Sequence, residues 1–115
     1  MPEVDDILAG TETIADGFMV QLSGEIDLVR SPLLRAKLMD LLVSRPHRLV
    51  VDLTQVPLMD SSGVATLIEV LQAQSSSGRK LILCGLQDKV KSVFEITRLH
   101  QVFVIVDNHS EACEI

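Results

Sequence analysis

Apolar and polar residues follow one another in short segments that predict strands and helices in alternation. Residues 17–26 show a partial alternation of apolar and polar positions, which indicates a strand. An earlier stretch, residues 8–15, is expected to pair with it at an edge of the sheet through the turn signal Asp16-Gly17. Residues 48–53 are almost continuously apolar, which is typical of a strand buried inside a sheet. Two further strands are predicted at residues 80–84, before Gly85, and at residues 102–106.

The helix signals fall between these strands. Ser31 is expected to be the N-cap of a first helix with Pro32 at its first position, and Arg45-Pro46 is expected to end it. A second helix is predicted to begin at Asp60 or Ser61 and to end within residues 75–78. Its apolar positions recur at helical spacing: Val64, Leu67, Ile68 and Leu71.

Two shorter helices complete the pattern. One is predicted over residues 88–97 with Val90, Val93 and Phe94 facing inward, and a last one is expected to start at Asn108 or Ser110. Because strands and helices alternate, the sequence predicts an α/β fold in which helices cover a sheet. The length of 115 residues and the lack of linkers or repeats predict that residues 1–115 form a single domain.

Composition and charge narrow the function classes. The chain is 47% hydrophobic and 23% charged, which is typical of a globular protein. A net charge of -6 and the absence of Trp and Tyr argue against nucleic acid, and the charge disfavours binding to an anionic membrane. A protein partner with a basic patch is the expected alternative. The acidic start of the chain and the lack of a long apolar run predict a cytoplasmic protein.

The residue types that carry catalysis do not form a recognisable pattern. No spacing places His47, His100 or His109 beside a nucleophile, so each is expected to be a solvated surface side chain. Cys84 and Cys113 predict neither a disulfide framework nor a metal site, and Cys84 is expected to be a buried, inert thiol. Nucleophile-elbow and phosphate-binding glycine motifs are absent. We therefore expect no enzyme activity, no cofactor and no metal.

Two polar clusters stand out at the ends of neighbouring strands: Gly24-Glu25-Ile26-Asp27 and Asp60-Ser61-Ser62-Gly63. Loops beyond strand ends are where α/β sheets carry their ligand and regulatory sites, so Asp27 and Asp60 are expected near Ser61. A phosphate on a hydroxyl there would be well received at the helix N-terminus. The same residue types are also common turn chemistry, in which Asp60 caps a helix and Asp27 caps a loop. The residues alone leave both interpretations open.

The order of these elements resembles the STAS domain family, specifically bacterial anti-sigma factor antagonists. Four segments carry the resemblance: residues 22–27, 50–53, 59–64 and 90–99. It covers roughly residues 18–111 and implies a four- or five-stranded mixed sheet with helices and no enzymatic activity. It also implies that Ser61 is phosphorylated, that Asp27 and Asp60 lie beside it, and that Ser62, Gly63 and Val64 belong to a docking surface.

The resemblance further implies two protein partners. The unphosphorylated domain would bind a serine-kinase anti-sigma factor with a histidine-kinase-like ATPase fold and so free a sigma factor. The kinase would use ATP-Mg to phosphorylate and release the domain, and a metal-dependent serine phosphatase would reset it. An accessory subunit of an ABC-type membrane transporter also resembles this chain, and a scaffold role without sigma control is a third alternative. The serine at position 61 and the acidic chain favour the antagonist.

Overall fold

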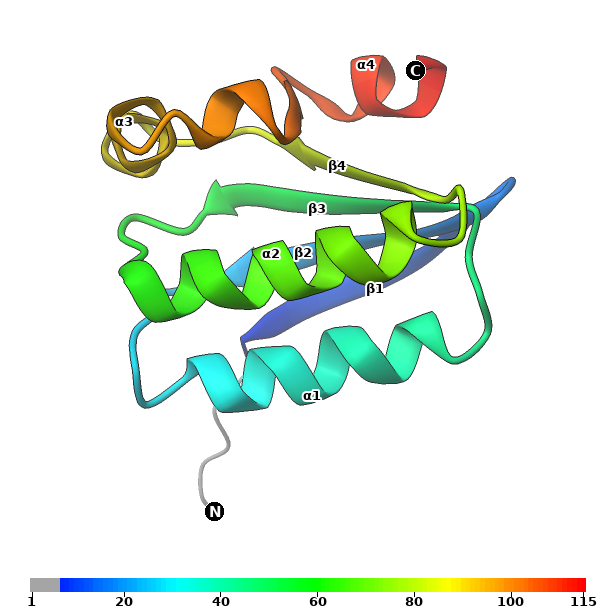
Figure 1. Ribbon diagram of the computed structural model, residues 1–115, viewed down its shortest axis with the longest axis horizontal. Coiled ribbons are helices and arrows are strands. Elements are labelled where there is room, and N and C mark those ends of the chain that lie inside the picture. The colour runs from blue at the N-terminus through cyan, green and yellow to red at the C-terminus, as the bar shows by residue number, and fades with distance from the viewer. Residues whose placement is uncertain (1–6) are drawn as a thin grey trace.

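Five strands form one mixed sheet in the order β1-β2-β3-β4-β5, in a computed structural model that describes residues 7–115 (Figure 1). The strands are β1 (Leu8–Ile14), β2 (Gly17–Ser23), β3 (Arg48–Gln55), β4 (Lys80–Cys84) and β5 (Val104–Val106). β1 runs antiparallel to β2, and the other three pairs are parallel. The predicted edge hairpin and the α/β fold class are therefore confirmed.

Helices cover the two faces of this sheet unequally. They are α1 (Ser31–Leu42), α2 (Ser61–Ser75), α3 (Asp88–Ile96) and α4 (His109–Glu114), with a 3-10 turn η1 (Leu99–Gln101) before β5. Buried residues of α1, α2 and α3 pack in one large cluster against β2, β3 and β4. On the other face, Ala112 of α4 packs against Val50, Ile82 and Cys84. The short α4 is thus the cover of the second face.

The central strand β3 is buried on both faces. Leu49, Val51 and Leu53 belong to the large cluster, and Val50 belongs to the cluster under α4. This follows from the alternation of side chains along a strand and explains why an interior parallel strand has a continuous apolar sequence. Asp52 interrupts this apolar run with a carboxylate, and it is only 2% exposed.

The first helix begins and ends differently from the prediction. The N-cap is Arg30, without a side-chain cap, and Ser31 is already helical, so the N-cap assignment to Ser31 was wrong. The reason is Asp27, whose carboxylate satisfies the amides that precede the helix. α1 also ends at Leu42, because Arg45 takes a left-handed φ of 58° and turns the chain before the proline.

Three predicted strands are longer than the observed ones, β1 by a single residue at its end and β2 and β5 by more. β2 ends at Ser23, because Gly24 has a φ of 87° and bends the chain away from the sheet. β5 starts at Val104 rather than at residue 102, because the amides of Val102 and Phe103 bond back to Leu99 in the turn η1. The predicted bounds of β4 are confirmed, and α4 begins after its N-cap Asn108 as expected.

Candidate functional site

Asp60 is the N-cap of α2. Its Oδ1 accepts hydrogen bonds from the amides of Ser62 and Gly63, at 2.9 and 3.3 Å, and from the Ser62 hydroxyl at 2.5 Å. The Ser62 hydroxyl is the main cause of a pKa of Asp60 below its ordinary value, and the amides lower it further. Of the two capping residues that the sequence left open, the structure selects Asp60.

Ser61 is the first residue of α2 and is exposed. Within residues 7–115, its hydroxyl has no hydrogen-bond partner. It lies at the positive end of the helix dipole, which favours a negative charge. The side chain is therefore accessible to another protein and chemically uncommitted.

Asp27 lies in the loop between β2 and α1. Its Oδ1 accepts hydrogen bonds from the amides of Val29 and Arg30, at 3.1 and 2.9 Å. The Arg30 guanidinium reaches back to the carbonyl oxygens of Ser23 and Glu25, which closes this loop. Asp27 thus caps a turn, as Asp60 caps a helix, and both carboxylates bond mainly to backbone amides.

The two polar clusters are joined through their backbones. The amide of Ile26 donates to the carbonyl oxygen of Leu58, and the amide of Asp60 donates to that of Ile26, both at 3.0 Å. Ile26 and Met59 form an isolated parallel bridge beyond the ends of their strands. The two clusters therefore adjoin through their backbones, and none of these bonds runs from a carboxylate to Ser61.

The other predicted docking residues differ in exposure. Ser62 is half-buried, whereas Gly63 and Val64 are buried. A Cβ on Gly63 would lie 2.7 Å from Ile26 Cγ2 and 2.7 Å from Met59 Cγ. Because Gly63 has no side chain, α2 can pack closely on the Ile26–Met59 bridge, and this packing fixes the position of Ser61.

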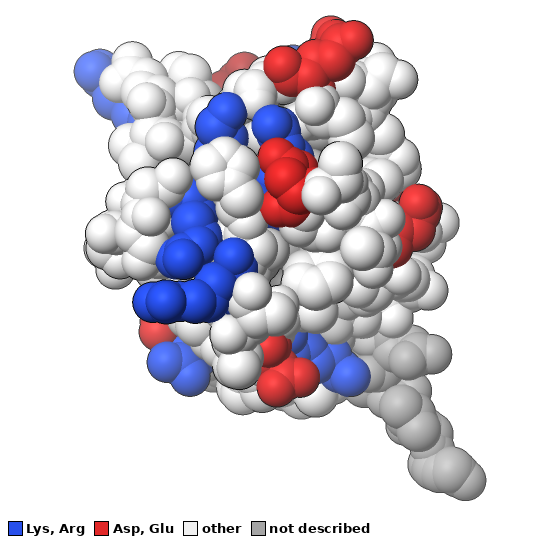
Figure 2. All heavy atoms as spheres, turned by 90° about the vertical axis from the view of Figure 1, so that its right-hand side faces the viewer, with Lys and Arg blue, Asp and Glu red and all other residues white. Residues whose placement is uncertain are grey.

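Three exposed apolar side chains flank this site, and sequence reasoning did not single them out. Leu28 and Val29 are 74% and 84% exposed, and Leu58 is 42% exposed. The sequence did hold a signal, because each of the three lies within two residues of Asp27 or Asp60. At the opposite end of the molecule, where β3 and β4 begin, Lys and Arg side chains gather instead (Figure 2). The surface around Ser61 thus combines apolar side chains with carboxylates.

The histidine expectations are confirmed in part. His47 and His100 are exposed, but His109 is not a solvated side chain: its Nε2 lies 2.6 Å from Oδ2 of the buried Asp52. Cys84 is buried as expected, and this burial raises the pKa of its thiol to about 12, with a smaller contribution from Asp52. Sequence reasoning did not single out Asp52. The one available signal was a carboxylate within an apolar strand.

None of the helices within residues 7–115 is long and apolar enough to cross a membrane.

Known proteins resemble this chain in sequence along nearly its whole length. The family model described as "STAS domain" matches residues 8–112. The anti-sigma-B factor antagonist of Listeria monocytogenes is 30% identical over 100 residues, which cover 87% of this chain and 88% of the relative. The corresponding antagonist of Staphylococcus epidermidis is 29% identical over 89 residues, with 77% and 82% covered.

Solved structures share the fold. An anti-sigma factor antagonist from Mycobacterium paratuberculosis superposes with a TM-score of 0.83 at 22% identity, covering 90% of this chain and 88% of the other. The antagonist SpoIIAA in its unphosphorylated form superposes with a TM-score of 0.70 at 19% identity, covering 90% and 92%. With a family match across nearly all its length and a shared sheet, the chain belongs to the STAS domain family.

Proposed function

We propose that this chain is an anti-sigma factor antagonist that works by partner switching. With Ser61 unphosphorylated it binds a serine-kinase anti-sigma factor of histidine-kinase-like ATPase fold, and phosphorylation of Ser61 releases it. The observation that carries this proposal is the exposed Ser61 hydroxyl at the start of α2, which has no partner within residues 7–115. The names of the Listeria and Staphylococcus relatives support the same role.

This chain supplies the hydroxyl that accepts the phosphoryl group, and the kinase supplies ATP-Mg and the base. The Ser61 oxygen attacks the γ-phosphorus of the kinase's ATP-Mg, the bond from that phosphorus to the leaving ADP oxygen breaks, and a base of the kinase takes the hydroxyl proton. Asp60 keeps the first turn of α2 in a fixed geometry, so the hydroxyl is presented at a fixed point. A metal-dependent serine phosphatase hydrolyses the phosphoserine and restores the binding form.

The surface around Ser61 explains the direction of the switch. Leu28, Val29 and Leu58 offer apolar area to a partner next to the hydroxyl. A phosphate adds a charge of about -1.5 to -2 at the centre of this surface, beside a region that already contains Asp27 and Asp60. Desolvation and repulsion at one close contact are expected to cost about 3 kcal/mol, or roughly a hundredfold in affinity.

Ser62, Gly63 and Val64 have a supporting role in this proposal. Ser62 holds the capping carboxylate through its hydroxyl and amide. The buried Gly63 and Val64 set the position of α2 against the sheet. Their substitution would therefore change docking by moving Ser61, rather than by removing a direct contact.

The decisive experiment measures phosphorylation and binding with the cognate kinase. With ATP-Mg, the wild-type chain should gain a single increment of about 80 Da that maps to Ser61. Ser61→Ala should bind the kinase persistently, and Ser61→Asp should lose binding by roughly a hundredfold. Ser77→Ala, at an exposed position beyond the far end of α2, is the matched control and should still accept the phosphoryl group. Equal affinity of the Ala and Asp variants at position 61 would refute the switch, and co-purification with an ABC-type subunit would favour the transporter alternative.

A further inference from the structure

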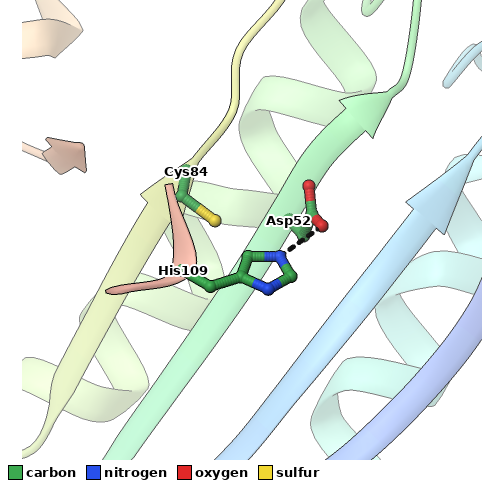
Figure 3. A group of neighbouring side chains, drawn as sticks. All are labelled: Asp52, Cys84 and His109. Atoms are coloured by element: carbon green, nitrogen blue, oxygen red, sulfur yellow. Dashed lines mark hydrogen bonds and ion pairs between the residues drawn. The ribbon is translucent and has the colours of Figure 1, made fainter. Parts of the chain in front are cut away.

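A carboxylate, a thiol and an imidazole converge on the sheet face that α4 covers. Figure 3 shows Asp52 on β3 and Cys84 on β4 side by side, with the imidazole of His109 pointing toward Asp52. Asp52 and Cys84 are register partners of the parallel strands, so their side chains share one face. One ligand atom from each of the three residues lies within 4.8 Å of the other two.

Asp52 is a carboxylate buried in the middle of the sheet. A charge in the middle of a sheet is unfavourable unless it is paired or binds a metal. Its carboxylate accepts from the Thr54 amide at 2.9 Å and from the Gln21 side chain at 3.3 Å, besides its contact with His109. These bonds satisfy an anion, but they do not explain why a thiol stands next to it. An ion pair needs no sulfur, whereas a metal site uses all three groups.

The set of donor atoms selects the class of metal. Sulfur, imidazole nitrogen and carboxylate oxygen together are typical ligands of Zn²⁺, which prefers four ligands in a tetrahedron. Ideal zinc bonds place such atoms about 3.3 to 3.6 Å apart. The Nε2 and Oδ2 atoms, now at 2.6 Å, would separate slightly, and the most distant pair would close by roughly an ångström. Rotations of side chains are sufficient for such shifts.

We propose that Asp52, Cys84 and His109 bind Zn²⁺ or a similar divalent transition-metal ion, with a fourth position filled by water. Access is available, because a solvent-open pocket reaches these residues between Gly85 and the start of α4. The His109 side chain is itself 42% exposed. When the ion binds, the Cys84 sulfur forms a bond to the metal and its proton leaves to solvent, so no oxidant or reductant is needed.

Binding would fasten α4 to the sheet. At present Arg48 holds this helix by donating to the carbonyl oxygens of Ala112 and Ile115, at 2.7 and 2.8 Å. The contact between His109 and Asp52 already joins the start of α4 to β3, and a metal would add a bond to Cys84 on β4. A ligand that binds only the folded state raises its stability by mass action. This inference is independent of the proposed phosphorylation of Ser61.

The test uses the full chain without an affinity tag and Co²⁺ as a probe. Co²⁺ should saturate at one ion per chain and show a near-ultraviolet thiolate-to-metal band with the visible bands of tetrahedral coordination. Zn²⁺ should displace it. A wild-type chain that shows no thiolate band at saturating Co²⁺ would overturn the proposal.

Matched variants locate the site. Cys84→Ala should lose the thiolate band, whereas Cys113→Ser should keep it. An alternative site would consist of His109 and Cys113, which lie four residues apart on α4. If the band is lost in Cys113→Ser but kept in Cys84→Ala, the metal binds at this alternative site and the proposal is wrong.

Histidine variants keep the test valid if Cys84→Ala does not fold. His109→Gln replaces a side chain that is 42% exposed and should fold. It should weaken Co²⁺ binding at least about tenfold, since loss of even an outer-shell partner costs that much. His100→Gln, at an exposed position, should bind as the wild type does. Zn²⁺ should also raise the Tm of the wild type but not that of His109→Gln, and equal shifts in both would refute the site.

Discussion

The amide of Asp60 donates a hydrogen bond of 3.0 Å to the carbonyl oxygen of Ile26. Together with the bond from the amide of Ile26 to the carbonyl oxygen of Leu58, it joins the loop after β2 to the loop before α2. The apolar side chains of Leu28 and Leu58 and the Ser61 hydroxyl are therefore parts of one connected unit. A partner meets them in a fixed relative arrangement, which favours tight binding because little order is lost on docking.

Gly63→Ala tests the packing that holds this unit together. The added Cβ would lie 2.7 Å from Ile26 Cγ2 and from Met59 Cγ, which is too close for both. Alanine has the better helix propensity, by up to about 1 kcal/mol, but overpacking costs typically 1–3 kcal/mol. We predict a net loss of about 1 kcal/mol in the free energy of unfolding, measured by urea denaturation.

Gly10→Ala is the matched control for that substitution. The nearest atom to its added Cβ is Gln21 Oε1 at 3.5 Å, an ordinary contact. Its stability should therefore stay closer to the wild type than that of Gly63→Ala. A Gly63→Ala variant as stable as Gly10→Ala would contradict the proposed close packing of α2 on the Ile26–Met59 bridge.

Asp60→Ala tests the cap of α2. The substitution removes the acceptor of the Ser62 and Gly63 amides, so it is expected to lower the free energy of unfolding. Thermal or urea unfolding should show this decrease. Asp88→Ala is a suitable comparison, because Asp88 lies in the first turn of α3 without a side-chain cap bond. Equal losses in the two variants would assign the effect to helix-dipole charge and not to the cap.

The cap also predicts a pH dependence. The Ser62 hydroxyl and the amides of α2 lower the pKa of Asp60 below 3.8 in the folded state. A lowered folded pKa means that the stabilisation is present above the unfolded pKa and is lost as pH falls through the folded one. The amide resonances of Ser62 and Gly63 should therefore titrate with a midpoint below 3.8.

Ser62→Ala provides the control for this titration. It removes the hydroxyl that has the largest effect on the pKa of Asp60 but keeps both backbone amides. The midpoint should move up toward 3.8. A wild-type midpoint at or above 3.8 would show that the carboxylate is not held by these bonds.

Signals between residues close in the sequence were sufficient to predict part of this fold. The helical spacing from Val64 to Leu71 and the polar cluster before it predicted α2 and limited its cap to Asp60 or Ser61, since both depend on neighbours a few residues apart. The start of α1 was misplaced because its first amides are satisfied by Asp27, through a turn that no periodicity reveals. The bond between Asp52 and His109 joins positions 57 residues apart, so only the assembled fold brings them together.

Val29→Ser tests the apolar part of the proposed docking surface. Val29 is 84% exposed, so its replacement should leave the free energy of unfolding nearly unchanged. If the kinase covers this side chain, the loss of apolar burial should weaken binding by about tenfold. Val43→Ser is the matched control, since Val43 is 77% exposed at the far end of α1. Affinity for the kinase, measured by calorimetry, should fall for the first variant alone, and equal affinities would place the docking surface away from Val29.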